Sequence, residues 1–226
     1  MTSNTLFLNH RMAEAARYAL MRRLLPAIRH NIAGSLQPVG MLASMLERRM
    51  QAAAPDLAQL GKSCQALNTL AREAVVTSLD LMNWLAPRDN DLVAVNGAVE
   101  ESLGMIATEL SFRGFSVMNQ TSGMQASLPR GIFRSVFTAS LIALTDSVEN
   151  AADVVVTAKS TGSQTQLTIT LKPGGRTELA GMGVRAPTYR GIDWDDVQAL
   201  ANAEGVSLSH ESNCAQLRYC ASLAPG

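Results

Sequence analysis

Apolar and small residues recur at alternating intervals of three and four in the first part of the chain, and this spacing favours helices with one buried side. One such stripe lies within residues 25–46 and a second within residues 57–85, and the connection between them includes Pro55 and Asp56, which suit a helix start. We predict helices over residues 10–50 and 55–84 that form an antiparallel hairpin. The first stripe is Leu25, Ile28, Ile32, Ser35, Val39, Leu42 and Leu46. The second is Leu57, Leu60, Cys64, Leu67, Ala71, Ala74, Ser78, Leu81 and Leu85.

A single hairpin cannot bury two stripes of this length and still shield both helices. Two copies of the hairpin would cover both stripes in a four-helix bundle. We therefore predict a homodimer through this region. The alternative is that the hairpin packs against the rest of its own chain.

The second half of the chain has a different pattern, with short alternating strands between apolar helices. Proline, charges and asparagine interrupt the helical spacing at residues 87–90, which indicates a linker. The fold class predicted is α+β: a helical hairpin domain over residues 1–88 that forms a dimeric four-helix bundle, followed by an α/β sandwich over residues 89–226. Within the sandwich we expect strands at 91–95, 115–119, 152–158, 166–171, 206–211 and 216–223, and helices at 97–112, 130–148 and 193–204.

Composition excludes several classes of protein. A hydrophobic content of 47% supports a core, and the 19 basic and 19 acidic residues balance without a long basic run, so we expect no nucleic-acid partner. The three cysteines match neither a metal cluster nor a disulfide framework, which favours a reducing compartment. Charges interrupt the longest apolar stretches well short of the roughly 20 residues that span a bilayer. We expect a cytoplasmic protein that does not enter membranes.

His30 is the best candidate for a functional residue. Its helical phase places it on the side opposite the buried stripe, facing water. Its neighbours at three and four residues are Pro26, Ala27, Ala33 and Gly34, and none of them has a side chain long enough to cover an imidazole. The alternative is an ordinary surface histidine.

The order of these features resembles the catalytic core of a sensor histidine kinase over nearly the full chain. In that family a dimeric helical hairpin carries a phosphoacceptor histidine, and an α/β sandwich binds ATP. Residues 29–38, Arg-His-Asn-Ile-Ala-Gly-Ser-Leu-Gln-Pro, resemble the family's histidine box, with His30 at the phosphoacceptor position.

The part that would bind ATP departs from the family pattern in three places. Ala143 stands where the resemblance places a magnesium-binding asparagine, and a methyl group cannot ligate magnesium. Residues 172–175, Lys-Pro-Gly-Gly, stand where the family has a turn that contains the adenine-reading aspartate. Residues 188–196 stand where the family has its second glycine-rich loop. A shifted alignment would bring Asp146 or Asn150 close to the first position only. We therefore expect no ATP binding and no cofactor, with magnesium needed only in the receiver domain of a partner.

The resemblance and these departures together suggest a histidine phosphotransferase, in which His30 relays a phosphoryl group between receiver-domain aspartates of response regulators. Family autokinases place an acidic residue after the histidine, but this chain has Asn31, which cannot act as a base near neutral pH. The α/β domain would serve as a docking surface for the partner beside His30. The residues expected to contact the partner are Arg22, Arg29, Asn31, Ala33, Gly34 and Gln37.

The expected partners are a second copy of the chain, response-regulator receiver domains and, as a further candidate, a hybrid histidine kinase. Two other functions remain open at this point. One is a non-catalytic scaffold or inhibitor that copies the kinase shape in order to bind a kinase or a response regulator. The other is an active kinase with an unusual nucleotide site.

Overall fold

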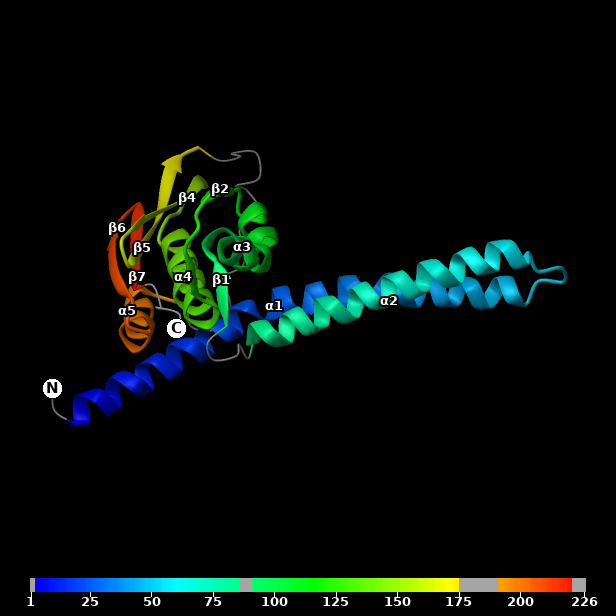
Figure 1. Cartoon of the computed structure of the whole chain (residues 1–226), viewed down its shortest axis with the longest axis horizontal. Coiled ribbons are helices and arrows are strands. Elements are labelled where there is room, and N and C mark those ends of the chain that lie inside the picture. Colours follow the sequence, from blue (N-terminus) through cyan, green and yellow to red (C-terminus); the bar gives the residue numbers. More distant parts are fainter. Residues whose placement is uncertain (1–2, 86–90, 175–190, 221–226) are drawn as a thin grey trace. The chain divides into compact units, whose positions relative to one another are not determined.

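Helices α1 (Ser3–Met50) and α2 (Leu57–Leu85) form the predicted hairpin in the computed structural model, which describes residues 3–85, 91–174 and 191–220. The chain divides into two compact units. The hairpin unit comprises Leu25–Ala86, and the α/β unit comprises Met1–Leu24 together with Pro87–Gly226. Helix α1 therefore begins in the α/β unit and continues into the hairpin unit (Figure 1).

In the hairpin unit the two helices run side by side in opposite directions (Figure 1). Helix α2 begins after Asp56, whose carboxylate accepts a hydrogen bond of 3.1 Å from the backbone N–H of Gln59, as expected of a capping residue. Near the same end, the Arg49 Nη1 donates a hydrogen bond of 2.9 Å to the Ser63 hydroxyl. The predicted hairpin is confirmed, although α1 begins at Ser3 and not near residue 10.

A five-stranded sheet forms the centre of the α/β unit, with strand order β2-β4-β5-β7-β6. Strands β2 and β4 are parallel, and the other neighbours are antiparallel. The strands are β2 (Ser116–Gln120), β4 (Ala152–Thr161), β5 (Gln164–Pro173), β6 (Ser207–Glu211) and β7 (Cys214–Cys220). A second, two-stranded sheet pairs β1 (Leu92–Ala94) with β3 (Ser127–Pro129).

Helices α3 (Val95–Phe112), α4 (Arg130–Asp146) and α5 (Trp194–Ala203) lie on one side of the sheet (Figure 1). Their apolar sides meet alternate buried residues of the central strands, such as Leu167, Ile169 and Leu217. Phe133 of α4 stacks on Tyr219 of β7 with ring centroids 5.6 Å apart, and burial raises the pKa of the Tyr219 phenol. A helical hairpin and a helix-covered sheet confirm the predicted α+β class.

The sheet differs from the prediction at its turns. Strands β4 and β5 extend further than expected, so that Thr161 pairs with Gln164 across a two-residue turn in which Gly162 adopts a φ of +59°. The sequence did not predict β3, because three residues are too short to show an alternating pattern. The last part of the predicted final strand, residues 221–223, lies outside the described residues.

The first part of α1 belongs to the core of the α/β unit. Ala13, Ala16, Ala19, Leu20 and Leu24 are at most 3% exposed. The compact units thus divide the chain differently from the predicted domains 1–88 and 89–226, because residues 1–24 pack with the α/β part. The division at residue 88 as a boundary between functional domains stays a prediction.

Helix α5 begins with a complete capping box. The Asp193 carboxylate accepts a hydrogen bond of 3.0 Å from the backbone N–H of Asp196, and the Asp196 carboxylate accepts one of 3.3 Å from the N–H of Asp193. We expect Asp193→Ala to lower the free energy of unfolding by about 1 kcal/mol, because it leaves a helix-end N–H without its partner. Chemical denaturation measures this change.

Asp195 supplies the matched control for that substitution, because it lies in the same first turn and is not part of the box. Asp195→Ala removes only a charge near the helix N-terminus and should lower the free energy of unfolding less, by about 0.3 kcal/mol. Equal losses in the two variants would contradict a specific role for the capping box.

Candidate functional site

His30 lies on an exposed side of α1 in the hairpin unit. Ile28, two residues earlier, is only 5% exposed, and Ile32 is half-buried. The surface beside His30 is open: Ala33 and Gly34 are exposed, and a Cβ added at Gly34 would meet no heavy atom within 4 Å. A large partner can therefore approach the imidazole without displacing a side chain at these two positions.

The structure places five of the six other predicted contact residues around this position, and Arg22 is the exception. Ala33, Gly34 and Gln37 share the side of the helix that His30 occupies, and all three are exposed. Arg29 is exposed on one flank, and Asn31 is half-buried on the other. Arg22 is exposed but belongs to the α/β unit, and its side chain already has an interaction partner.

The hairpin has a second apolar surface, which combines Leu25, Leu57 and Cys64 of the predicted stripes with exposed apolar residues that lie outside those stripes. On α1 and on α2, apolar residues separated by 3, 4, 7 or 11 positions form stripes that remain exposed, with Leu57 at 80% and Met82 at 64%. We call these residues the outer face. They are Leu25, Leu36, Ala43 and Met50 on α1, and Leu57, Cys64, Val75, Leu79 and Met82 on α2.

The two stripes of the outer face lie on the same side of the hairpin. On each helix the exposed stripe is about a quarter-turn from the stripe that packs inside the hairpin, and the rotation has the same sense when each helix is viewed from its N-terminus. Because the helices are antiparallel, equal rotations bring both stripes to one side. His30 is about 140° around α1 from Leu25, so it faces away from the outer face.

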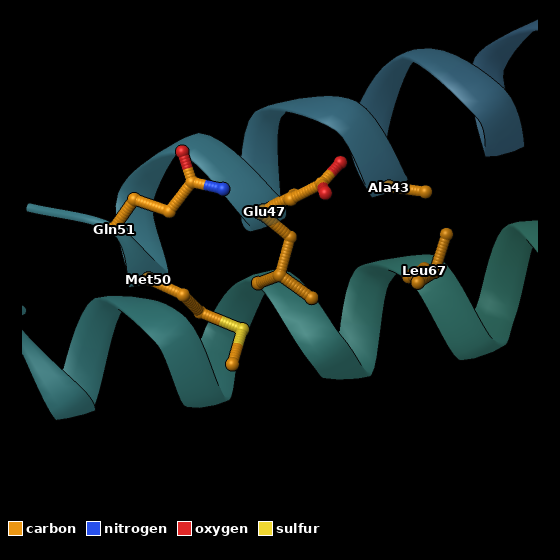
Figure 2. A pocket seen from close by; sticks show the side chains of 6 residues that line it. Ala43, Glu47, Met50, Gln51 and Leu67 are labelled. Carbon is orange, nitrogen blue, oxygen red and sulfur yellow. The ribbon is translucent and has the colours of Figure 1, made fainter.

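A groove of about 440 Å³ lies near the hairpin turn, where α1 faces α2 (Figure 2). Ala43, Met50 and Leu67 are among its lining residues. In Figure 2 Leu67 points from α2 toward α1, while the polar ends of Glu47 and Gln51 point away from α2. Since Ala43 and Met50 belong to the outer face, the groove continues that apolar surface.

The positions that would hold a nucleotide in the resembled family have other contacts here. Ala143 is 3% exposed on α4, so its methyl group is part of the core. The Asp146 carboxylate forms ion pairs with two arginines, at 2.6 Å from Arg113 and 3.5 Å from Arg23. Asn150 is exposed. The replaced glycine-rich loop and the segment before it lie largely outside the described residues, in 175–190.

The turn after β5 is closely packed. Gly174 has a φ of +156°, and a Cβ added there would lie 2.3 Å from an Asp153 carboxylate oxygen. Lys172, the residue across from Asp153 in the ladder, is exposed. The space beside Gly174 is thus taken by a carboxylate from the neighbouring strand.

Within residues 3–85, 91–174 and 191–220, no group of three or more His, Cys, Asp or Glu side chains is arranged to hold a metal ion. In the same part of the chain, no helix combines the length and apolar character needed to cross a bilayer. The three cysteines are free thiols. His210, on the edge strand β6, stacks on Trp194 with centroids 4.1 Å apart.

Comparison with known proteins gives structural matches only. No protein-family model matches the sequence, and no curated protein matches it. The histidine kinase AdeS of Acinetobacter baumannii matches with a TM-score of 0.46 and 16% identity, over 80% of this chain and 95% of that chain. A histidine kinase from Burkholderia phymatum matches with a TM-score of 0.42 and 14% identity, over 100% of each chain.

A third solved structure, a bacterial phosphotransferase, matches with a TM-score of 0.40 and 15% identity, over 88% of this chain and 94% of that chain. The chain resembles these proteins in fold, and the resemblance extends no further than the fold.

Proposed function

We propose that this chain is a histidine phosphotransferase of two-component signalling, which takes a phosphoryl group from a receiver-domain aspartate onto His30 and passes it to another receiver domain. The observation that supports this most is the exposure of His30 beside Ala33 and Gly34, on the side of α1 that faces away from the outer face. Phosphoryl transfer depends mainly on positioning and on electrostatic help, and a receiver domain can supply both metal and charge.

The chemical step needs little from the chain itself. A neutral imidazole has one ring nitrogen with a free lone pair. That nitrogen attacks phosphorus, the P–N bond forms as the P–O bond to the donor aspartate breaks, and the electron pair of the broken bond leaves with the carboxylate. The second ring nitrogen keeps its proton. The reverse sequence on another receiver completes the relay.

The neighbours of His30 support a partner-driven reaction. Asn31 is half-buried beside it and can donate or accept hydrogen bonds, but an amide cannot take a proton near pH 7. The exposed Arg29 guanidinium provides positive charge toward an acidic partner. We therefore assign partner contact to Arg29 and Gln37, and no general-base role to Asn31.

We also propose that the chain works without ATP. The buried methyl of Ala143 offers no oxygen to magnesium, and the Asp146 carboxylate is paired with Arg113. The carboxylate of Asp153 fills the space beside Gly174, in the turn where the resembled family reads adenine. Calorimetric titration with magnesium and ATP should give no binding in the micromolar range, and binding in that range would count against this part of the proposal.

A homodimer is the third part of the proposed function, with a second hairpin as the occupant of the outer face. An isologous contact needs a self-complementary surface, and apolar stripes on both helices provide one. In a four-helix bundle formed in this way, the apolar groove near Met50 would be filled, and His30 would remain exposed.

Incubation with a purified, phosphorylated receiver domain tests the proposed function. The chain should gain a phosphoryl group that is labile in acid and stable in base, as expected of phosphohistidine, and it should lose that group when a second, unphosphorylated receiver is added. With labelled ATP alone, no label should appear. Labelling by ATP would instead support an active kinase, and failure to accept phosphate from any cognate receiver would favour a scaffold.

A further inference from the structure

Residues 13–24 of α1 are packed against the α/β part of the chain, by which we mean residues 91–174 and 191–220. We call residues 13–24 the clamp segment. Its buried side combines three alanines with two leucines. Ala13, Ala16 and Ala19 are at most 2% exposed, and the short side chains let the α1 backbone approach its neighbours closely. Leu20 and Leu24 are 3% and 1% exposed, so both side chains are removed from water, which stabilises the packed state.

The clamp segment also forms an ion pair with the end of α5. The Arg17 guanidinium donates to the Glu204 carboxylate, and its other nitrogen pairs with Glu14 on the same helix. Burial lowers the pKa of Arg17, but the hydrogen bonds and charges of the two glutamates outweigh it and raise the pKa above the usual arginine value. Arg17 therefore stays charged near neutral pH.

A second group of charges connects α1 to the ends of α3 and α4. Arg23 donates to Glu109 and lies 3.5 Å from Asp146. Arg113 completes the group, with 2.6 Å to the Asp146 carboxylate and a hydrogen bond of 2.7 Å to the Thr145 carbonyl. The Arg23 and Arg113 side chains are only 13% and 15% exposed, so water screens these pairs less than it screens pairs on an open surface.

We propose that the clamp segment, the part of α1 directly before the hairpin unit, stays packed on the α/β part throughout phosphotransfer. The buried leucines and alanines and the two charge groups come from one segment and reach α3, α4 and α5. The clamp segment ends at Leu24, six residues before His30 on the same helix.

A consequence concerns the α/β unit alone: a closed clamp opposes any step of a reaction cycle that would separate residues 13–24 from the α/β part. This inference rests on the proposed function where it refers to phosphotransfer, but the closure of the clamp can be measured without any receiver.

Hydrogen–deuterium exchange on the full-length protein measures the closure directly. Arg17→Glu places like charges at residues 14, 17 and 204, so exchange of the amides in residues 13–24 should become about tenfold faster, which corresponds to about 1.4 kcal/mol. Arg17→Glu with Glu204→Arg restores an opposite pair and should return exchange toward the wild-type rate. Arg11→Glu, an exposed change in the same helix outside the clamp segment, should leave it unchanged.

The outcome of this exchange experiment does not depend on whether His30 accepts phosphate. If amides 13–24 exchange in the wild type as fast as an unprotected peptide, or if Arg17→Glu and Arg11→Glu act alike, the clamp does not exist. If His30 does not accept phosphate, the exchange results should still be as described above. Failure of the proposed function and absence of the clamp are therefore distinguishable.

A cross-link tests whether the clamp stays closed during transfer. Arg17→Cys with Glu204→Cys, in a chain whose Cys64, Cys214 and Cys220 are replaced by serine, allows a short bismaleimide to join the pair. The cross-linked protein should accept phosphate from a receiver within about twofold of the rate of the same variant without reagent. Loss of transfer only after cross-linking would overturn the proposal, because it would mean that the α/β part must leave α1.

Discussion

Replacing His30 with alanine should reduce phosphoryl uptake from a phosphorylated receiver to background, a loss of at least about a hundredfold. The methyl group of alanine has no lone pair that can attack phosphorus, and no other histidine lies on the exposed side of the hairpin unit within the described residues. Because His30 is exposed, its removal should change the free energy of unfolding by less than about 0.5 kcal/mol. The expected loss is therefore chemical and not structural.

His10→Ala is the matched control for this substitution. His10 is also an exposed histidine on α1, but it lies outside the hairpin unit. The His10 variant should be labelled at the wild-type rate. If the His30 variant were labelled equally well, the phosphoacceptor role would be wrong, and the scaffold hypothesis would gain support.

Placing a charge on the outer face should convert the dimer into a monomer. In Val75→Asp the symmetry of the bundle buries two carboxylates, one from each copy, and each unpaired buried charge costs several kcal/mol. A total penalty of about 3 kcal/mol or more weakens the dimer by over a hundredfold. Light scattering coupled to size-exclusion chromatography at micromolar concentration measures the mass of the particle.

The chain offers a closely matched control in the next residue. Val75 and Val76 are both 58% exposed on α2, but Val76 lies about 100° around the helix and outside the outer face. Val76→Asp should therefore leave the dimer intact. A wild-type protein that is monomeric, or equal effects from the two aspartates, would contradict the proposed bundle.

The sequence predicted the hairpin well because its two helices have regular apolar spacing. Ile28, Ala74 and Leu81, from the predicted stripes, are at most 6% exposed. The outer face was not identified as a separate surface, because residues such as Leu36 and Leu79 lie between the positions of the two predicted three-four stripes. A search for a second stripe, about a quarter-turn from the first, would have found them.

The clamp segment was also missed, for a physical reason. Its buried side is formed largely by alanines, and alanine is common on every side of a helix, so Ala13, Ala16 and Ala19 give little contrast with their neighbours. The ion pairs that join Arg17 to Glu204 and Arg23 to Glu109 connect residues far apart in the chain. Spacing within one helix cannot reveal such contacts, although the run Ala16, Leu20 and Leu24 was a usable signal.

For the α/β part, the sequence predicted most elements but few of their ends. Gly205 follows the C-terminal end of α5 and has a φ of +68°, as expected from its position directly after the helix. Strand β3 and the extended β4 to β5 hairpin depend on partners across the sheet, which local patterns do not include. The side of α1 on which His30 lies followed directly from helical phase, because that phase is fixed by the buried stripe.

The central claim is that the phosphoryl group resides on His30 between two receivers. Rapid quenching of a reaction with a phosphorylated receiver, followed by peptide mapping under alkaline conditions, locates the group directly. The proposed function predicts that it appears on His30 and disappears from there when a second receiver is added. A phosphoryl group found on His10, on His210 or on no residue of the chain while phosphate moves between the receivers would contradict the claim.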